Sequence, residues 1–135
     1  MRVCGTGTRG GTIKLTNENF NAKIPVVGNF EKVSFAIFEQ SLKDLGEYTS
    51  KEDAFAIWED IRLPERSTAG SAGYDIRSPL KVTLPSNGVG VVIPTGIRVK
   101  IRDGWVFTIC PRSGLGFKYG VTLQNTCGII DAEVA

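Results

Sequence analysis

The chain has 135 residues, enough for one domain with a buried core and too few for two ordinary domains. Hydrophobic residues make up 41% and charged residues 22% of the sequence, which is typical of a globular protein rather than a disordered one. No apolar run approaches the ~18 residues of a membrane-spanning helix, and the first residues lack the apolar stretch of a signal peptide. We therefore expect a cytoplasmic protein that does not bind membranes.

Histidine does not occur in the sequence. Its absence excludes Ser-His-Asp and Cys-His catalysis as well as metal binding by imidazole. Acid–base chemistry must then use carboxylates, lysine, tyrosine or thiols. The three cysteines, Cys4, Cys110 and Cys127, form no CxxC pair, so we expect buried thiols rather than a metal site or a disulfide framework.

Charge is unevenly distributed along the chain. The net charge is +3 over residues 1–30, −5 over residues 31–61, and +4 over residues 62–135. A modestly basic main body suits a phosphorylated ligand. With a sequence pI of about 8.5 the chain lacks the strongly basic character of proteins that bind duplex nucleic acid, so no nucleic-acid partner is expected.

Residues 1–30 are rich in Gly, Thr and Asn and predict an extended or strand-forming arm. Within this arm, Gly5 to Gly10 fits the pattern G-x-G-x-x-G. A dinucleotide site would also need a buried strand before the pattern and a helix after it. Residues 11–16 instead have the composition of a strand, so we interpret the pattern as a glycine-rich turn.

Two short helices are predicted between residues 34 and 61. The first begins with Ser34 as a cap and ends at Gly46, and the second begins with the capping pair Ser50 and Asp53 and ends before Pro64. Apolar residues recur at helical spacing at Phe35, Phe38, Leu42 and Leu45, and then at Ala54, Ile57, Trp58 and Ile61. Eight acidic residues fall in residues 31–61, and we expect them on the outer faces of a solvated helical hairpin.

From residue 62 onward the pattern changes to short strands. Strands are predicted at residues 81–84 and 89–93 around a turn, and at residues 97–101, where apolar and basic residues alternate. Asp103-Gly104 predicts a tight hairpin between residues 97–101 and a returning strand at 105–110. Closely spaced strands without intervening helices indicate a sandwich or a barrel-like body.

Three segments in this strand background carry chemical groups. Residues 71–76 place Asp75 after a turn of small residues. Residues 111–116 end a strand with Arg112, Ser113 and glycines, a turn that offers phosphate-binding donors. Residues 124–131 combine Asn125, whose amide can pair with a base edge, with Asp131 six residues later.

In this order the three segments resemble the motifs of the trimeric deoxyuridine triphosphatases (dUTPases). The A-G-x-D motif matches residues 72–75, the P-R-S-G/S-L motif matches residues 111–115, and N-x-x-G-x-I-D-x-D-Y matches residues 125–134. The helical stretch resembles an insertion found in a subgroup of bacterial and phage members. The resemblance implies a mainly β fold, a distorted jelly-roll (β-clip), with a short helical hairpin inserted near the N-terminus.

The resemblance also implies an activity and a set of roles. The reaction would be hydrolysis of dUTP to dUMP and pyrophosphate with Mg²⁺, in a homotrimer whose sites lie between subunits. Asp131 would be the general base that activates water, and Asp75 would hold the metal ion through water. The substrate-binding residues implied are Arg112, Ser113 and Gly114 for the phosphates, and Asn125 with the backbone of Gly128, Ile129 and Ile130 for uracil.

The sequence departs from the family pattern at its end. Val134 stands where the family has a tyrosine that packs under the deoxyribose, and Glu133 replaces an aspartate. The family continues beyond this point with a fourth motif and a glycine-rich arm. We therefore expect residues 1–135 to be a single dUTPase-like domain that is truncated at the C-terminus, with an arm at 1–30, a helical insertion at 31–62 and a β body at 63–135.

Two alternatives remain open at this point. The missing arm and Val134 favour a dUTPase-fold protein that hydrolyses poorly and acts, as a nucleotide-binding or regulatory protein, by binding nucleotide or a protein partner. A relative of dCTP deaminase, an enzyme of another reaction class, would need a different catalytic carboxylate further along the chain. The spacing from Asn125 to Asp131 fits hydrolysis better.

Overall fold

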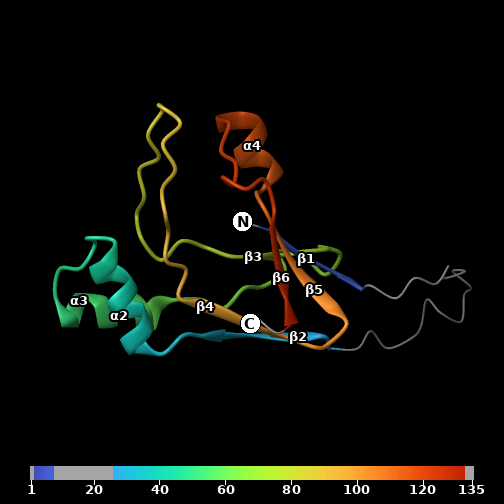
Figure 1. Cartoon of the computed structure of the whole chain (residues 1–135), viewed down its shortest axis with the longest axis horizontal. Coiled ribbons are helices and arrows are strands. Elements are labelled where there is room, and N and C mark those ends of the chain that lie inside the picture. Colours follow the sequence, from blue (N-terminus) through green and yellow to red (C-terminus); the bar gives the residue numbers. More distant parts are fainter. Residues whose placement is uncertain (1, 8–25, 133–135) are drawn as a thin grey trace, which may run out of the picture.

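The computed structural model describes residues 2–7 and 26–132, with side chains described from residue 26 onward (Figure 1). The predicted strand at 11–16, together with Glu133 and Val134, lies outside the described residues. The elements are β1 (Arg2–Gly7), β2 (Gly28–Lys32), α2 (Phe35–Asp44), α3 (Lys51–Asp60), β3 (Tyr74–Asp75), β4 (Ile97–Ile101), β5 (Trp105–Cys110), α4 (Ser113–Tyr119) and β6 (Gly128–Asp131). In this part of the chain the short strands form no closed barrel, and no helix is long and apolar enough to cross a membrane.

β5 is an inner strand of an antiparallel four-stranded sheet with the order β3-β1-β5-β6. On one edge it pairs with β1, from Arg2 opposite Cys110 to Gly7 opposite Trp105. On its other edge it pairs with β6. Part of the predicted arm is therefore an inner strand. The interpretation of the glycine pattern as a turn is wrong for Gly5 to Gly7, which belong to β1, and the rest of the pattern lies outside the described residues.

A second sheet contains β2 and β4, which pair from Gly28 opposite Ile101 to Lys32 opposite Ile97. The alternation predicted for β4 is confirmed, because its apolar residues are half-buried and its basic residues are exposed. Aromatic rings join the two sheets. The Phe30 ring lies 5.4 Å from that of Tyr74 in β3 and 5.7 Å from that of Phe107 in β5, centroid to centroid.

The prediction of a hairpin at Asp103-Gly104 is wrong. The turn itself forms, with Gly104 at φ +80° and the N–H of Trp105 donating to the carbonyl of Arg102 at 3.1 Å. However, β4 pairs with β2 and not with β5, because both edges of β5 are already occupied by β1 and β6. The turn therefore carries the chain from one sheet to the other.

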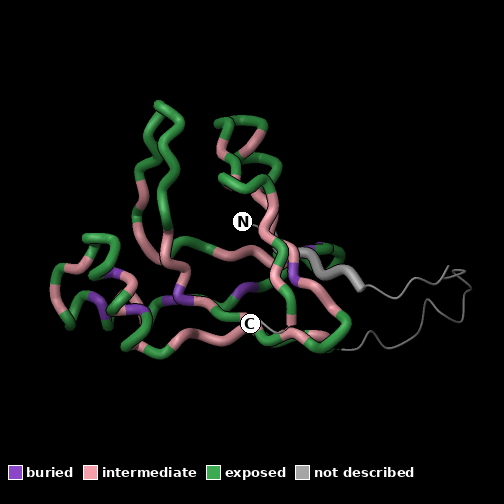
Figure 2. Tube along the Cα trace, in the orientation of Figure 1, coloured by how far each residue is buried: buried purple, intermediate pink, exposed green. Residues whose placement is uncertain are grey.

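The strands predicted at 81–84 and 89–93 are also absent from the structure, which assigns no strand to those residues. Two extended legs run side by side around a turn and project from the body (Figure 1). Nearly all of the projection is exposed (Figure 2). Its exposed residues include the apolar Leu84, Val89, Val91 and Val92. A strand pattern needs a neighbouring surface to bury its apolar face, and none of the described residues provides one here.

The two predicted helices are confirmed. The Ser34 hydroxyl accepts from the N–H of Ile37 at 3.4 Å, and the Ser50 hydroxyl accepts from that of Asp53 at 3.0 Å. α2 and α3 enclose a cluster of buried side chains: Phe38, Leu42, Ala54 and Ile61. The helical hairpin therefore has a small core of its own at one end of the molecule (Figure 2).

Gly96 connects this helical core to the β body. It is buried, has φ +66°, and its carbonyl accepts from the N–H of Val33 at 3.0 Å. A Cβ atom at this position would overlap Ile61 Cδ1 and lie 3.1 Å from Phe38 Cδ2. Both the backbone conformation and the available space therefore require glycine.

Gly96→Ala should lower the free energy of unfolding by about 2–4 kcal/mol, since it combines a left-handed backbone with overpacking of the core. Gly46→Ala is the matched control, because Gly46 has φ +72° but nothing within 4 Å of a new Cβ. The control should lose only about 1–2 kcal/mol from the backbone. Urea denaturation measures both, and equal losses would show that packing against Ile61 and Phe38 does not matter.

Candidate functional site

The backbone of Asp75 is held on both sides. Its N–H donates to the carbonyl of Glu65 at 3.0 Å, and on its other side it lies opposite Arg2 of β1. The Asp75 side chain is only 14% exposed. A carboxylate on a backbone fixed in this way has a defined direction, which a binding residue needs.

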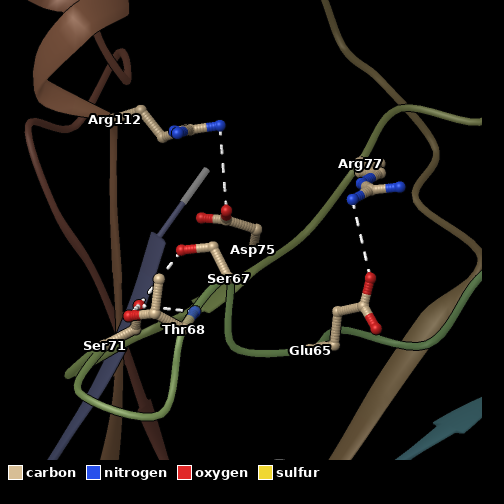
Figure 3. A network of polar contacts seen from close by, with 7 residues as sticks. All are labelled: Glu65, Ser67, Thr68, Ser71, Asp75, Arg77 and Arg112. Atoms are coloured by element: carbon tan, nitrogen blue, oxygen red, sulfur yellow. Dashed lines mark hydrogen bonds and ion pairs between the residues drawn. The ribbon is translucent and has the colours of Figure 1, made fainter.

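Arg112 reaches this carboxylate from a distant part of the sequence. It follows β5, and its Nη1 lies 3.7 Å from Oδ2 of Asp75 (Figure 3). The pairing of β1 with both β3 and β5 accounts for this approach, because Arg2 lies opposite both Asp75 and Cys110. The Arg112 side chain is 57% exposed, so the contact contributes little to stability and leaves the guanidinium accessible to a ligand.

The prediction of a turn at residues 111–116 is wrong, because helix α4 begins at Ser113. The N–H groups of Leu115 and Gly116 donate to the carbonyl of Arg112 at 3.0 and 3.1 Å. The N–H groups of Ser113 and Gly114 lie at the open N-terminal end of α4, where no intrahelical acceptor is available to them. An open pocket of about 530 Å³ is lined by Arg112, Ser113, Gly114, Leu115, Lys118 and Tyr119.

Asn125 lies in the turn that leads into β6 and is exposed. Its carbonyl accepts from the N–H of Cys127 at 2.6 Å, and Thr126 has φ +65°. The following residues, Gly128 to Ile130, belong to β6, which is an edge strand of the described sheet. Alternate backbone N–H and C=O groups of an edge strand face away from its neighbour, and a ligand can pair with them.

Asp131 lies far from this group within one chain. It is exposed and sits opposite Val106 of β5, four residues before Cys110 and roughly 14 Å along the strand. Arg112 lies two residues after Cys110, at the end of β5 that is farther from Asp131. The structure therefore brings Asp75, Arg112, Ser113 and Gly114 together and leaves the predicted base at the other end of the β5–β6 pair.

The sequence did not predict a polar network around Ser71, in the loop that precedes Asp75. The buried hydroxyl of Ser71 lies 3.0 Å from that of Ser67 and 2.9 Å from that of Thr68, and it accepts from the N–H of Thr68 at 3.1 Å (Figure 3). These contacts close the loop that leads to β3. The signal in the sequence was the spacing of three hydroxyl residues, which is typical of local side-chain-to-backbone turns.

The residues present fit a hydrated metal ion. In the part of the chain that the structure describes, no group of three or more Asp, Glu, Cys or His side chains could cage one. Mg²⁺ is commonly held by one or two carboxylates and by substrate phosphates while it keeps several waters. A single, fixed carboxylate such as Asp75 suits that mode.

Two comparisons with known proteins, one with family models and one with individual sequences, point to the same family. The dUTPase family model matches residues 59–135. Proteins named deoxyuridine 5'-triphosphate nucleotidohydrolase are 38% identical over 76 residues in Fusobacterium nucleatum, 46% over 79 residues in Psychromonas ingrahamii and 47% over 79 residues in Pseudomonas fluorescens. These matches cover 56–57% of this chain and 52% of each relative, so the chain spans about half the length of the curated relatives it matches. No solved structure matches it significantly.

Ser71→Ala should lower the free energy of unfolding by about 1–3 kcal/mol, because it removes the shared partner of two hydroxyls and one N–H. Ser67→Ala is the matched control, since Ser67 is exposed and its loss leaves the contacts between Ser71 and Thr68 intact. The control should change stability by about 0.5 kcal/mol or less, as surface substitutions usually do. Denaturant unfolding would contradict this account if the two variants were equally stable.

Proposed function

The chain belongs to the dUTPase family, and from that membership we propose that it hydrolyses dUTP to dUMP and pyrophosphate. The observation that carries the proposal is the match over residues 59–135, which contains all three motif segments, including Asp75 and Arg112. The relatives compared above are nucleotidohydrolases, which does not favour a deaminase or a purely regulatory protein. The family fold is mainly β, and we propose that the two sheets are parts of a distorted jelly-roll.

The phosphate chain would bind at the start of α4. Arg112 supplies an exposed guanidinium there, and Ser113 and Gly114 supply a hydroxyl and N–H groups. Donors of these kinds bind phosphate oxygens and stabilise the charge that develops in the transition state. The open pocket along this segment gives the phosphates a place to lie.

Uracil would bind at the turn before β6. The Asn125 side chain is exposed and can both donate and accept hydrogen bonds, as a base edge requires. The backbone of Gly128 to Ile130 adds the outward-facing groups of an edge strand. A carbonyl and an N–H at fixed spacing would distinguish uracil from cytosine.

Asp131 would act as the general base. Its carboxylate is exposed at the end of β6, where it can accept a proton from a water directed at the α-phosphorus. A carboxylate base is also consistent with a sequence that has no histidine. When Mg²⁺ is bound, it would neutralise charge on the phosphates, and Asp75 would hold it through water.

We propose a homotrimer with sites between subunits, and the separation of Asp131 from Arg112 within one chain supports it. The distance along the β5–β6 pair keeps Asp131 of one chain from the phosphates that Arg112 of the same chain would bind. Large apolar side chains are exposed near both halves: Phe117 at 94%, Ile129 at 70% and Tyr119 at 64%. Surfaces of this kind favour contact with another protein surface.

Asp131→Asn should retain binding of dUTP and lose turnover by a factor of roughly 10²–10⁴, because an amide cannot accept the proton. Asp103→Asn, which alters an exposed carboxylate in the turn before β5, is the matched control and should keep full turnover. Pyrophosphate release and calorimetric binding of a non-hydrolysable dUTP analogue separate the two effects. Undiminished turnover in Asp131→Asn would remove Asp131 from the role of base.

Arg112→Ala and Asp131→Asn should each be nearly inactive alone and should regain activity when the two variants are mixed. Mixed trimers would contain some sites with Arg112 from one chain and Asp131 from another. The variants are unfolded together, refolded together, and assayed for pyrophosphate release against each variant refolded alone. If the mixture stays as inactive as its components while each variant is trimeric by light scattering, the two residues act within one chain.

A further inference from the structure

Two cysteines that are far apart in the sequence meet at the end of the β5–β6 pair. Cys110 is the last residue of β5, and Cys127 immediately precedes β6. The last pair of this register is Ile109 opposite Gly128, and Cys110 and Cys127 are the residues directly beyond that pair. Their sulfur atoms are 3.8 Å apart and both thiols are free and half-buried.

This placement, at the end of an antiparallel pair, is compatible with a disulfide. Residues directly opposite each other in an antiparallel pair have Cα atoms about 4.5–5.5 Å apart. Disulfides span Cα distances of about 4.4–6.8 Å. The sulfur atoms are 3.8 Å apart, so rotation of the side chains has a short gap to close before they reach the bonding distance of about 2.05 Å.

We propose that Cys110 and Cys127 are a reversible thiol–disulfide site at the base of the segment 111–126. That segment begins next to Cys110 and ends next to Cys127, and it contains α4 as well as Arg112 and Asn125. Bond formation does not depend on the proposed hydrolytic function. Any effect on nucleotide binding would depend on it.

A small disulfide such as oxidised glutathione can supply the oxidising equivalents. The Cys127 thiolate attacks one sulfur of glutathione disulfide, forms a mixed disulfide and releases one glutathione thiolate. The Cys110 thiol then loses its proton and attacks the Cys127 sulfur, which releases the second glutathione. Two protein thiols are oxidised to one disulfide, and one glutathione disulfide is reduced to two glutathione molecules.

The order of these steps follows from the environment of Cys110. Burial, followed by the hydrogen bond and the charge of Cys127, raises the pKa of the Cys110 thiol. A raised pKa lowers the thiolate fraction of Cys110, and because the thiolate is the nucleophile, we assign Cys110 to the second step.

The bond would restrict the segment that it closes. Residues 111–126 would be tied at both ends, so their local opening should become less frequent. Amide hydrogen exchange should therefore slow in this segment in the oxidised protein and stay unchanged in the helical hairpin, which lies elsewhere in the fold.

Tryptic mapping tests the bond directly, because cleavage after Arg2, Arg9, Arg102, Arg112 and Lys118 places the three cysteines in separate peptides. The full chain is equilibrated with reduced and oxidised glutathione, free thiols are blocked with iodoacetamide, and the digest is analysed without reduction. We expect peptide 103–112 linked to peptide 119–135. Links that involve Cys4, mixed glutathione disulfides alone, or a link found only in covalent dimers would overturn the proposal.

Variants provide the matched controls. Cys4→Ser should keep the linked peptides, whereas Cys110→Ser should lose them with little change in side-chain volume. Oxidised glutathione should slow hydrogen exchange at 111–126 in Cys4→Ser and leave it unchanged in Cys110→Ser. Equal slowing in both variants would show that the slower exchange does not come from this bond. The linked peptides are also mapped in the unmodified protein, so the test of the bond does not depend on how well a variant folds.

Discussion

The pairing of β5 on both of its edges is the constraint on which the rest of the structure depends. With β1 on one edge and β6 on the other, β5 cannot pair with β4, so after Ile101 the chain crosses from the two-stranded sheet into the four-stranded sheet. The same register sets Asp75 and Cys110 on either side of Arg2. A single strand with fixed neighbours thereby decides both how the sheets divide and which functional side chains come together.

This register also separates the chemistry into two groups. At the Cys110 end of β5 lie the exposed guanidinium of Arg112, the carboxylate of Asp75 and the open end of α4. At the other end, opposite Val106, lies Asp131. Hydrolysis at phosphorus needs a base and phosphate-binding groups within a few ångströms of each other. Because Asp131 and Arg112 lie at opposite ends of β5 within one chain, the proposed activity depends on the proposed homotrimer.

The sequence predicted local features well and non-local pairing poorly. The helices were predicted from Ser34, Ser50 and Gly46, because caps and stops act within a few residues. The Asp103-Gly104 turn was also correct, but the partner of β4 depends on which strands occupy β5, and local patterns carry no such information. The motif segments located the candidate residues, whereas the approach of Arg112 to Asp75 and the network around Ser71 depend on contacts that only the folded chain forms.

The proximity of Cys110 and Cys127 follows from the same non-local register, and for that reason the spacing of the cysteines in the sequence did not predict it. Both thiols lie one step beyond the rung that joins Ile109 to Gly128, on the row that continues through Arg2 to Asp75. A bond at this position would tie β5 to β6 at the end where phosphate binding is proposed and leave the Asp131 end unchanged. Oxidation would therefore act on the positioning of Arg112 and Asn125, while the Asp131 carboxylate, proposed as the base, kept its place at the far end of β6.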